Sequence, residues 1–329
     1  MTAELKPLRR IAAYAVCADD AGHVLLIRES VRSGTPGVWT LPGGSVLHGE
    51  HPRDAVVREA AAESGLLLRA GTPIDVLADT RARPHREVTL HTDRIIFRAE
   101  VVSGEPEPLS PMVDEVRWVT TDEAATLQLR PFASQILKLP LSTVDLPPEE
   151  MPELPGFHIQ QAPDGRHTVQ RFAAYGLVRD PRGRVLLTQV AEGYPDAGCW
   201  HLPGGGTDFG EQPAQALLRE LVEETGQHGR IRSLLGVASH REPEQVGPEG
   251  FAIDWHGVRP YYDVIVDEPG EIVLADVGGS TVGARWFDSA EVTELAVTAV
   301  TREALHAVSG APTPPGPDDG RWSPRLRAH

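Results

Sequence analysis

Short apolar runs, each bounded by turn residues, recur along the chain in a regular order. Near the N-terminus, residues 14–17 and 24–27 predict two strands joined by the turn sequence DDAG. The same arrangement returns at residues 176–179 and 185–189, where the turn sequence is DPRG. The pattern therefore predicts that a pair of strands opens each half of the chain.

A helical pattern follows each strand pair after a glycine-rich loop. Pro52 and Pro213 stand where proline suits the first turn of a helix, and Gly65 and Gly226 stand where glycine ends one. Further strands are predicted at residues 94–101 and 258–266. Strands before and after a helix predict a mixed α/β fold in which the helix packs on a sheet.

The two halves are copies of one unit. Residues 10–66 align without a gap to residues 171–227, and roughly two in five aligned positions are identical. A second matching segment surrounds Trp118 and Trp286, after a longer loop in the second copy. We therefore predict an N-terminal domain over residues 1–140, a Pro-rich acidic linker over 141–165, a C-terminal domain over 166–310 and a disordered tail over 311–329.

The composition is that of a globular protein, and the charge narrows the range of partners. Apolar residues make up 40% and charged residues 24%, which is enough for a packed core in each half. Asp and Glu outnumber Lys and Arg by 47 to 31, and the formal net charge of −16 disfavours binding to nucleic acid or to an anionic membrane. Two cysteines lie far apart, without metal or redox spacing. We expect a cytoplasmic protein with a small-molecule substrate.

The second copy contains a group of glutamates at helical spacing. Glu220, Glu223 and Glu224 lie three or four residues apart at most, so a helix can place all three on one face. Like charges at this spacing repel one another, and a bound cation would relieve the repulsion. Mg²⁺ prefers oxygen ligands and keeps water and phosphate oxygens in its shell. These residues therefore predict a site for Mg²⁺, or for Mn²⁺ in its place, that activates water against a phosphoanhydride.

A solvated helix face could carry the same glutamates, but other residues fix their register. Gly205 is followed by five residues and Glu211, and then by seven residues and Arg219. This sequence resembles the Nudix box and departs from it only at the last position, where Gln227 replaces an apolar residue. The resemblance implies two tandem copies of a Nudix-type α/β/α sandwich with a mixed sheet, and a metal-dependent hydrolase.

The resemblance also implies a role for each matching residue of the second copy. The implied metal ligands are three carboxylates and one carbonyl oxygen, from Glu220, Glu223, Glu224 and Gly204. Arg219 and Glu211 would form an ion pair that orients the helix, with Glu211 also near the metal ions. The base that deprotonates the attacking water varies within the family, and Glu220 and Glu224 are the first candidates here.

The first copy departs from the pattern at one carboxylate. It keeps Glu59 and Glu63 as metal ligands, but Ala62 stands where the second copy has Glu223. We predict that the first site holds fewer metal ions or holds them more weakly. Three interpretations remain open for this copy: a slower hydrolase, a ligand-binding domain without activity, or a structural partner of the second copy.

A segment peculiar to the second copy offers residues for substrate binding. Trp255 and Tyr261 could provide an aromatic face for a base, and Arg259 could bind a phosphate. The alternation expected of a strand explains the aromatic residues equally well.

The leading hypothesis is a metal-dependent hydrolase that cleaves a phosphoanhydride in a nucleoside triphosphate, or in a nucleoside diphosphate linked to another moiety. We expect the principal site in the C-terminal domain. The alternative is a nucleotide or ADP-ribose sensor whose N-terminal Nudix domain is not catalytic. The repeat also predicts that the two domains pack on each other within the chain, as the subunits of a homodimer would.

Overall fold

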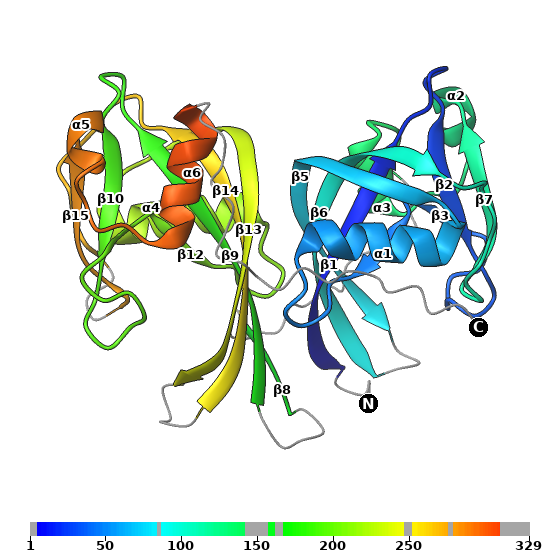
Figure 1. Cartoon of the computed structure of the whole chain (residues 1–329), viewed down its shortest axis with the longest axis horizontal. Helices are drawn as coiled ribbons and strands as arrows, with labels where there is room; N and C mark the ends of the chain where they lie inside the picture. Colours follow the sequence, from blue (N-terminus) through cyan, green and yellow to red (C-terminus); the bar gives the residue numbers. More distant parts are fainter. Residues whose placement is uncertain are drawn as a thin grey trace.

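The structure is a computed structural model, which describes residues 5–83, 87–141, 157–161, 167–246, 252–275 and 279–309. Most of the predicted linker, at 142–156 and 162–165, and the predicted tail at 311–329 lie outside the described residues. Within the described ranges the chain forms two halves of similar architecture (Figure 1).

The same types of element follow one another in both halves. The N-terminal half contains β1 (Lys6–Cys17), β2 (Val24–Glu29), β3 (Trp39–Thr40), β4 (Gly43–Ser45), α1 (Pro52–Ser64), β5 (Leu67–Arg83), β6 (Val88–Ser103), β7 (Val113–Val119), α2 (Thr121–Ala124) and α3 (Pro131–Ile136). The C-terminal half contains β8 (Phe157–Gln161), β9 (His167–Arg179), β10 (Val185–Val190), β11 (Trp200–His201), β12 (Gly204–Gly206), α4 (Pro213–Thr225), β13 (Arg230–Val246), β14 (Ala252–Ile265), β15 (Thr281–Phe287), α5 (Ser289–Val292) and α6 (Ala299–Ser309).

The sheets of both halves are mixed. In the N-terminal half the larger sheet has the order β4-β1-β6-β5, in which β1 is parallel to β6 and antiparallel to β4. A smaller sheet has the order β3-β2-β7. In the C-terminal half the order is β11-β10-β9-β14-β13, with β9 parallel to β14. Strands β8 and β12 also pair with β9, and β15 pairs with β10. The predicted mixed α/β fold is thus present twice.

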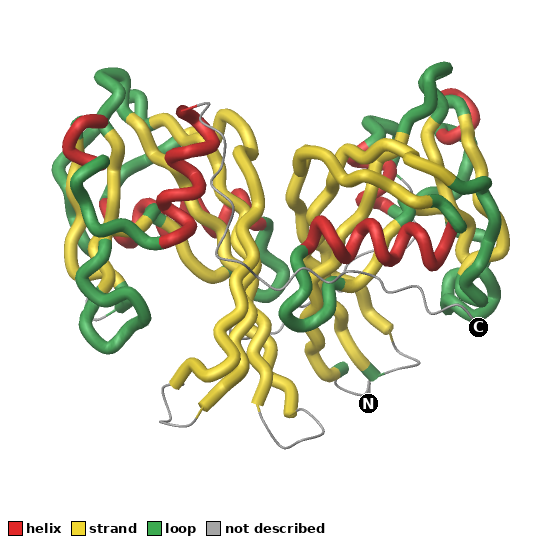
Figure 2. The backbone as a smooth tube through the Cα atoms, viewed as in Figure 1, coloured by secondary structure: helices red, strands yellow, loops and turns green. Residues whose placement is uncertain are grey.

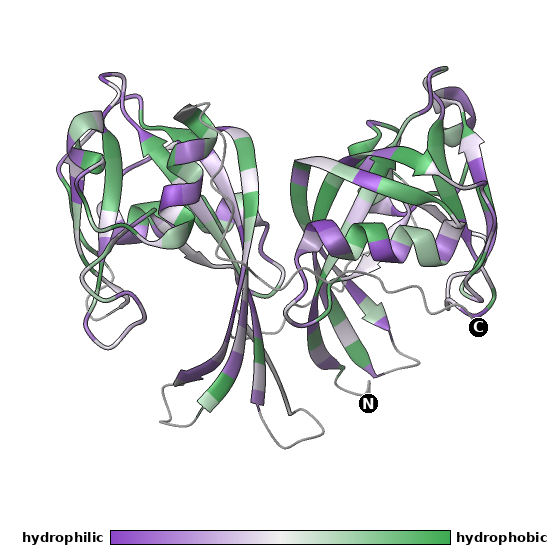
Figure 3. Ribbon diagram, viewed as in Figure 1, coloured by the Kyte–Doolittle hydropathy of each residue, from purple (hydrophilic) through white to green (hydrophobic). Residues whose placement is uncertain are grey.

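Helices cover both faces of the central sheet in each half. On one face of the N-terminal sheet, Val56 of α1 shares a buried core with Phe97 of β6. On the other face, Phe132 of α3 packs with Tyr14 of β1, and their ring centroids are 4.6 Å apart. Helices α4 and α6 cover the two faces of the C-terminal sheet in the same way. Hydrophilic and hydrophobic residues alternate around α1 and α6, as expected of helices with one side on a sheet (Figure 3).

The long helices begin and end where the sequence predicts. Helix α1 starts at Pro52 and its C-cap Gly65 has φ 71°, while α4 starts at Pro213 and its C-cap Gly226 has φ 70°. This left-handed conformation favours glycine because a Cβ there would be strained. No helix in the described part of the chain is long and apolar enough to cross a membrane.

Several strands are longer than the sequence predicts. Strand β9 pairs with β14 from His167 onward and with β8 on its other side. Strand β8, at residues 157–161, falls within the segment predicted as linker and extends the sheet instead. Figure 2 shows the strands of the C-terminal half running well past its helices. Sequence periodicity missed these extensions because their residues mix polar and apolar side chains without a clear alternation.

The two halves pack on each other within the chain, as the repeat predicts. Phe172, Val237 and Val258 of the C-terminal half are part of the buried core that surrounds α1. These side chains are at most 7% exposed, so the contact is a continuous apolar interior and not a loose surface contact.

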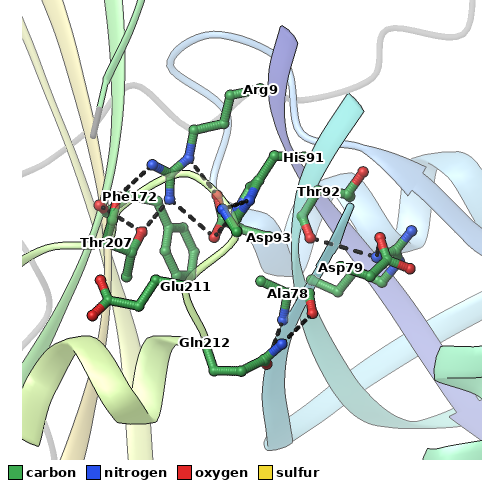
Figure 4. A network of polar contacts seen from close by, with 12 residues as sticks. Arg9, Ala78, Asp79, His91, Thr92, Asp93, Phe172, Thr207, Glu211 and Gln212 are labelled. Carbon is green, nitrogen blue, oxygen red and sulfur yellow. Dashed lines mark hydrogen bonds and ion pairs between the residues drawn. The ribbon is translucent and has the colours of Figure 1, made fainter. Parts of the chain in front are cut away.

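Polar contacts complete this interface (Figure 4). Arg9 of β1 pairs with Asp93 at 2.8 Å and donates to the carbonyl oxygen and hydroxyl of Thr207 in the other half. At the position equivalent to Arg9, Gln170 donates to the carbonyl oxygen of Val46 at 3.5 Å. Equivalent positions therefore cross the interface in both directions, as in a dimer with twofold symmetry.

Candidate active site

Helix α4, which carries the acidic residues, is fixed on the C-terminal sheet by its apolar side. Leu217 and Leu221 are fully buried and pack in one cluster with Ala174 of β9 and Val264 of β14. Burial of two leucine side chains contributes roughly 3–6 kcal/mol to this docking. The packing fixes the rotation of α4, and with it the side on which Glu220 lies.

The glycine-rich strand β12 lies directly against the acidic residues of α4. Gly204 has φ 135°, and a Cβ there would lie 2.2 Å from the carbonyl oxygen of Ala174. A Cβ at Gly205 would lie 2.6 Å from the carboxylate carbon of Glu220. Both distances are far below a normal contact, so only glycine lets the strand approach β9 and the carboxylate this closely.

Arg219 ties the acidic residues together. Its Nε and Nη2 donate to the two carboxylate oxygens of Glu211 at 2.9 and 3.1 Å, which is a bidentate ion pair. Its Nη1 donates at 3.0 Å both to Glu220 and to Glu223. Nη2 also donates to the carbonyl oxygen of Gly206 at 3.1 Å, so one guanidinium links α4, β12 and the loop between them.

The electrostatics of the cluster leave negative charge uncompensated. Burial opposes ionisation of Glu211, but hydrogen bonds from Arg219 and from the backbone N–H of Asp208 outweigh it and lower its pKa. The pKa of Glu220 is raised, chiefly by burial, although Arg219 partly offsets the effect. One guanidinium therefore serves three neighbouring carboxylates, and an added cation would stabilise the ionised cluster.

Glu224 is held by two other elements. Its Oε2 accepts a hydrogen bond from the backbone N–H of Gly204 at 2.9 Å, and its Oε1 accepts one from the hydroxyl of Thr281 on β15. Only 5% of Glu224 is exposed, so these two donors replace the water that the carboxylate loses on burial.

The donor set fits a hard divalent cation, although the carboxylates do not yet converge. Among the described residues, no three Asp, Glu, His or Cys side chains surround a common point. Glu220 and Glu223 turn toward Arg219, while Glu224 turns toward Gly204 and Thr281. Carboxylate and carbonyl oxygens are the ligands that Mg²⁺ prefers, and the excess negative charge of the carboxylates attracts a divalent cation.

A protein-family model described as NUDIX domain matches residues 8–139 and 169–308. The chain belongs to the NUDIX family. It has two NUDIX domains in tandem, as the sequence predicts, and the family is one of pyrophosphohydrolases.

Curated relatives match segments of different length. CMP-5'-(N-acetyl-N-hydroxy-3-aminopropyl)phosphonate hydrolase of Streptomyces rubellomurinus is 32% identical over 210 residues, which cover 59% of this chain and 84% of the relative. The 8-oxo-dGTP diphosphatase of Haemophilus influenzae is 49% identical over 53 residues, covering 16% of this chain and 39% of the relative. The ADP-ribose pyrophosphatase of Methanocaldococcus jannaschii is 43% identical over 75 residues, covering 23% and 43%. The last two alignments span less than half of those relatives.

Solved structures of NUDIX proteins also align with the chain. The MutT NUDIX hydrolase from Burkholderia pseudomallei covers 42% of this chain and 98% of its own, with 28% identity and a TM-score of 0.32. RenU, a Nudix hydrolase from M. smegmatis, covers 46% of this chain and 94% of its own, with 24% identity and a TM-score of 0.31.

The N-terminal NUDIX domain keeps the scaffold of the site but lacks one carboxylate. Arg58 pairs with Glu50 at 2.7 and 2.8 Å and with Glu59 at 2.8 Å, as Arg219 does with its partners. Ala62 occupies the position of Glu223 and provides no ligand. The two sites therefore share the arginine-centred ion pairs and differ in the number of carboxylates.

The environment of Glu63 also differs from that of Glu224. The backbone N–H of Gly43 donates to Glu63 at 3.0 Å, but Val113 occupies the position of Thr281 and has no hydroxyl to donate. Burial raises the pKa of Glu63 to about 8, and the charges of Glu59 and Glu29 act in the same direction against the Gly43 hydrogen bond. Burial therefore disfavours the ionised form of Glu63.

The predicted substrate-binding residues share one face of β14. Trp255 and Arg259 are partly exposed on either side of Gly257, and a Cβ at Gly257 would lie 3.2 Å from Nε1 of Trp255 and 3.3 Å from Nε of Arg259. Tyr261 is only 4% exposed, and its hydroxyl lies 3.1 Å from a carboxylate oxygen of Glu303 on α6. Tyr261 is thus part of the core in this structure, whereas Trp255 and Arg259 border solvent.

Sequence reasoning missed three residues near the site: Thr281, Arg171 and His201. Each comes from a strand outside the glutamate motif. The repeat marks Arg171 by identity, because its counterpart is Arg10. It marks the other two by difference, because Thr281 and His201 replace Val113 and Thr40 of the first copy.

Proposed function

We propose that this NUDIX protein is a metal-dependent hydrolase with its principal active site in the C-terminal domain. Its substrate is a nucleoside triphosphate, or a nucleoside diphosphate linked to another moiety, and it cleaves a phosphoanhydride bond. The observation that carries the proposal is the set of three glutamates on α4. It includes Glu223, whereas the N-terminal copy has Ala62 at the equivalent position and lacks this carboxylate.

The names of the relatives support this substrate class. One is a diphosphatase of 8-oxo-dGTP, one a pyrophosphatase of ADP-ribose, and one a hydrolase of a CMP-linked phosphonate. The substrates in these names are all nucleotide derivatives, and they include both a triphosphate and a diphosphate linked to a sugar.

The residues of the site would divide the work as follows. Glu220, Glu223, Glu224 and the carbonyl oxygen of Gly204 would hold Mg²⁺. When bound, the ion supplies polarisation of a phosphoryl oxygen and a water of lowered pKa. Arg219 holds Glu211 and keeps α4 in register with β12. Glu220 and Glu224 are the proposed acceptors of the proton from the attacking water.

The test compares one substitution in each domain. Glu224→Gln removes a charge at the complete site, and we expect the turnover with Mg²⁺ to fall by roughly a hundredfold or more. Glu63→Gln makes the matched change in the other domain, and we expect it to retain most of the turnover. Release of phosphate or nucleoside monophosphate from a panel of nucleotides measures both. Equal losses in the two variants would show that the C-terminal site is not the principal one.

A second function is supported for the N-terminal domain alone. The domain keeps the ion-paired scaffold of Arg58 and Glu50 but lacks a ligand at Ala62, which favours binding without turnover. We propose nucleotide or ADP-ribose sensing as this alternative. Calorimetry with ADP-ribose on the Glu224→Gln protein tests it. If the N-terminal domain is a sensor, it should bind one equivalent of ADP-ribose in addition to the equivalent bound by the C-terminal domain.

A further inference from the structure

Two arginines recur at equivalent positions on the central strands of both domains. Arg10 on β1 corresponds to Arg171 on β9, and Arg94 on β6 corresponds to Arg259 on β14. The parallel register of β1 with β6 is the same as that of β9 with β14, so the Cα atoms of the paired arginines occupy equivalent positions in the two sheets. Their surroundings, however, differ between the two domains.

In the N-terminal domain, two hydroxyl groups satisfy the first arginine. Arg10 donates from Nε to Thr92 at 3.3 Å and from Nη1 to Ser45 at 3.4 Å. In the C-terminal domain, both of these positions are glycines, Gly257 and Gly206. Within the described ranges, Arg171 therefore donates no side-chain hydrogen bond and forms no ion pair.

The second arginine of the N-terminal domain is enclosed. Arg94 is 7% exposed, forms an ion pair with Asp79, and stacks on Phe132 with 4.4 Å between its Cζ and the ring centroid. In the C-terminal domain, His240 replaces Asp79 and Val300 replaces Phe132. Arg259 thereby loses both its counter-charge and its aromatic cover.

Arg259 is left with its donors available. It is partly exposed, and in the part of the chain that the structure describes it has neither an ion pair nor a side-chain hydrogen bond. Guanidinium groups without acceptors, at a partly exposed surface, are ready to bind an anion.

Arg171 lies against β12 on the side opposite Glu220, because the neighbouring residues Gly205 and Gly206 face the two sides of the strand. A Cβ at Gly206 would lie 3.0 Å from Nη2 of Arg171, so this guanidinium lies over β12. The charge of Arg171 also acts to lower the pKa of Glu220, which places it within electrostatic reach of α4. Both arginines influence His201, whose pKa falls to about 3, mainly through burial and then through the charges of Arg259 and Arg171.

We propose that Arg171 and Arg259 form a phosphate-binding site for the substrate diphosphate, on the face of the C-terminal sheet that α6 covers and against β12. Two planar forks of N–H donors suit phosphate oxygens, and the net positive charge offsets that of the anion. Of the four arginines, only the two of the C-terminal domain have donors available for phosphate. Arg10 already donates to two hydroxyl groups, and Arg94 is enclosed by its ion pair and its aromatic neighbour. This inference rests on the proposed function for its substrate, but the binding itself requires no turnover.

Inorganic pyrophosphate, titrated by calorimetry in buffer with EDTA, is the probe. We expect one pyrophosphate per chain in the full-length protein, and we expect Arg171→Ala with Arg259→Ala to weaken binding by roughly a hundredfold. Arg10→Ala is the matched control in the N-terminal domain and should leave the affinity unchanged. Binding of unchanged affinity in the double variant, or an equal loss in the control, would overturn the proposal.

A second variant separates loss of binding from loss of folding. Gly206→Ser with Gly257→Thr restores the hydroxyl acceptors of the first copy and keeps both arginines. Neither glycine has a positive φ, and a new Cβ would meet the ends of the Arg171 and Arg259 side chains and, at 3.2 Å, Nε1 of Trp255, so small side-chain shifts should let the strands tolerate the change. We expect about tenfold weaker binding of pyrophosphate with an unchanged melting temperature. Wild-type affinity here would contradict the role of the free donors.

Further measurements distinguish this proposal from the proposed function. Glu224→Gln should lower turnover by roughly a hundredfold or more but still bind pyrophosphate, so each property can fail without the other. A nucleoside diphosphate should compete with pyrophosphate, and the matching nucleoside should not compete. Competition by the nucleoside would mean that the arginines contact the base and not the phosphates, which would also overturn the inference.

Discussion

The side chain of Gln212 pairs with the backbone of Ala78 across the boundary between the two domains. Its Nε2 donates to the carbonyl oxygen of Ala78 at 2.5 Å, and its Oε1 accepts from the Ala78 N–H at 3.0 Å (Figure 4). Gln212 is also the N-cap residue of α4 and directly follows Glu211. The N-terminal domain therefore contacts the loop before α4, which carries Glu211 of the C-terminal active site.

Gln212→Ala tests whether this contact supports activity. Loss of two hydrogen bonds should lower the free energy of unfolding by about 1–3 kcal/mol. Because the loop would be less fixed, we also expect more Mg²⁺ to be needed for half-maximal turnover. Metal titrations of activity, together with thermal unfolding, measure the two effects.

The matched control is His51→Ala at the equivalent N-cap position of α1. His51 accepts a hydrogen bond from the backbone N–H of Arg53 at 3.0 Å, so its loss should reduce stability. It should leave the Mg²⁺ requirement of the C-terminal site unchanged. The same shift in Mg²⁺ requirement in both variants would indicate a general effect of stability.

Asp93 is a buried charge that pairs with Arg9, a residue that contacts the other half of the chain, and its replacement should destabilise the whole chain. Its carboxylate, which is fully buried, pairs with Arg9 at 2.8 Å and with His91 at 3.0 Å. Asp93→Asn would leave the guanidinium of Arg9 without its counter-charge, at a cost of about 3–5 kcal/mol. Chemical denaturation measures the loss. Glu100→Gln, in an exposed pair with Arg69, should cost less than about 1 kcal/mol.

The same residue predicts a dependence of stability on pH. Burial opposes ionisation of Asp93, but the charges of Arg9 and His91 outweigh it and lower its pKa from 3.8 to about 2. The unfolded chain takes up this proton at higher pH than the folded chain does. The stabilisation is therefore complete above about pH 4 and is lost as the pH falls toward 2. Asp93→Asn should lack this part of the acid transition, and an unchanged transition would contradict the assignment.

Thr281 should affect the rate through Glu224. Thr281→Val removes the hydroxyl that donates to Oε1 of Glu224 and keeps the shape of the side chain. We expect kcat to fall by about tenfold with little change in KM, since the residue orients a metal ligand and lies outside the proposed phosphate site. The reciprocal change Val113→Thr in the N-terminal domain should leave the rate unaffected. A change confined to KM would contradict a positioning role.

The sequence predicts those parts of the site that are contiguous. Glu211, Arg219 and the three glutamates of α4 lie in one helix and its preceding loop, so helical periodicity brings them together without knowledge of the fold. Thr281 is 57 positions from Glu224, and the contact of the Gly210 N–H with His91 spans 119 positions. Such contacts depend on how the sheets assemble, which local periodicity does not determine.

The repeat predicts more than its motif alone does, because its differences are also informative. The replacement of Thr92 and Ser45 by Gly257 and Gly206 is visible in the sequence as two isolated differences between copies. Only the strand register shows that both hydroxyls served the same arginine. The two substitutions act on one arginine, because Thr92 and Ser45 both accept hydrogen bonds from Arg10.

Restoring the missing carboxylate should strengthen cation binding in the N-terminal domain. Ala62 is exposed on α1, so Ala62→Glu introduces no steric conflict, and Arg58 is already placed to pair with it as Arg219 pairs with Glu223. We expect roughly tenfold tighter binding of Mn²⁺ at this domain, because a third carboxylate adds both a ligand and charge. Calorimetry on a Glu224→Gln background, with and without Ala62→Glu, measures the gain at this domain.

Ala62→Gln is the control for that experiment, because it adds the same length of side chain without the charge. If the glutamate variant binds Mn²⁺ more tightly than the glutamine variant, the absent carboxylate accounts for the weakness of the first site. Equal affinity in the two variants would instead indicate that the surroundings of Glu63 limit the site. In that case Val113→Thr, which provides the missing hydroxyl donor, should be needed in addition to Ala62→Glu before Mn²⁺ binding improves.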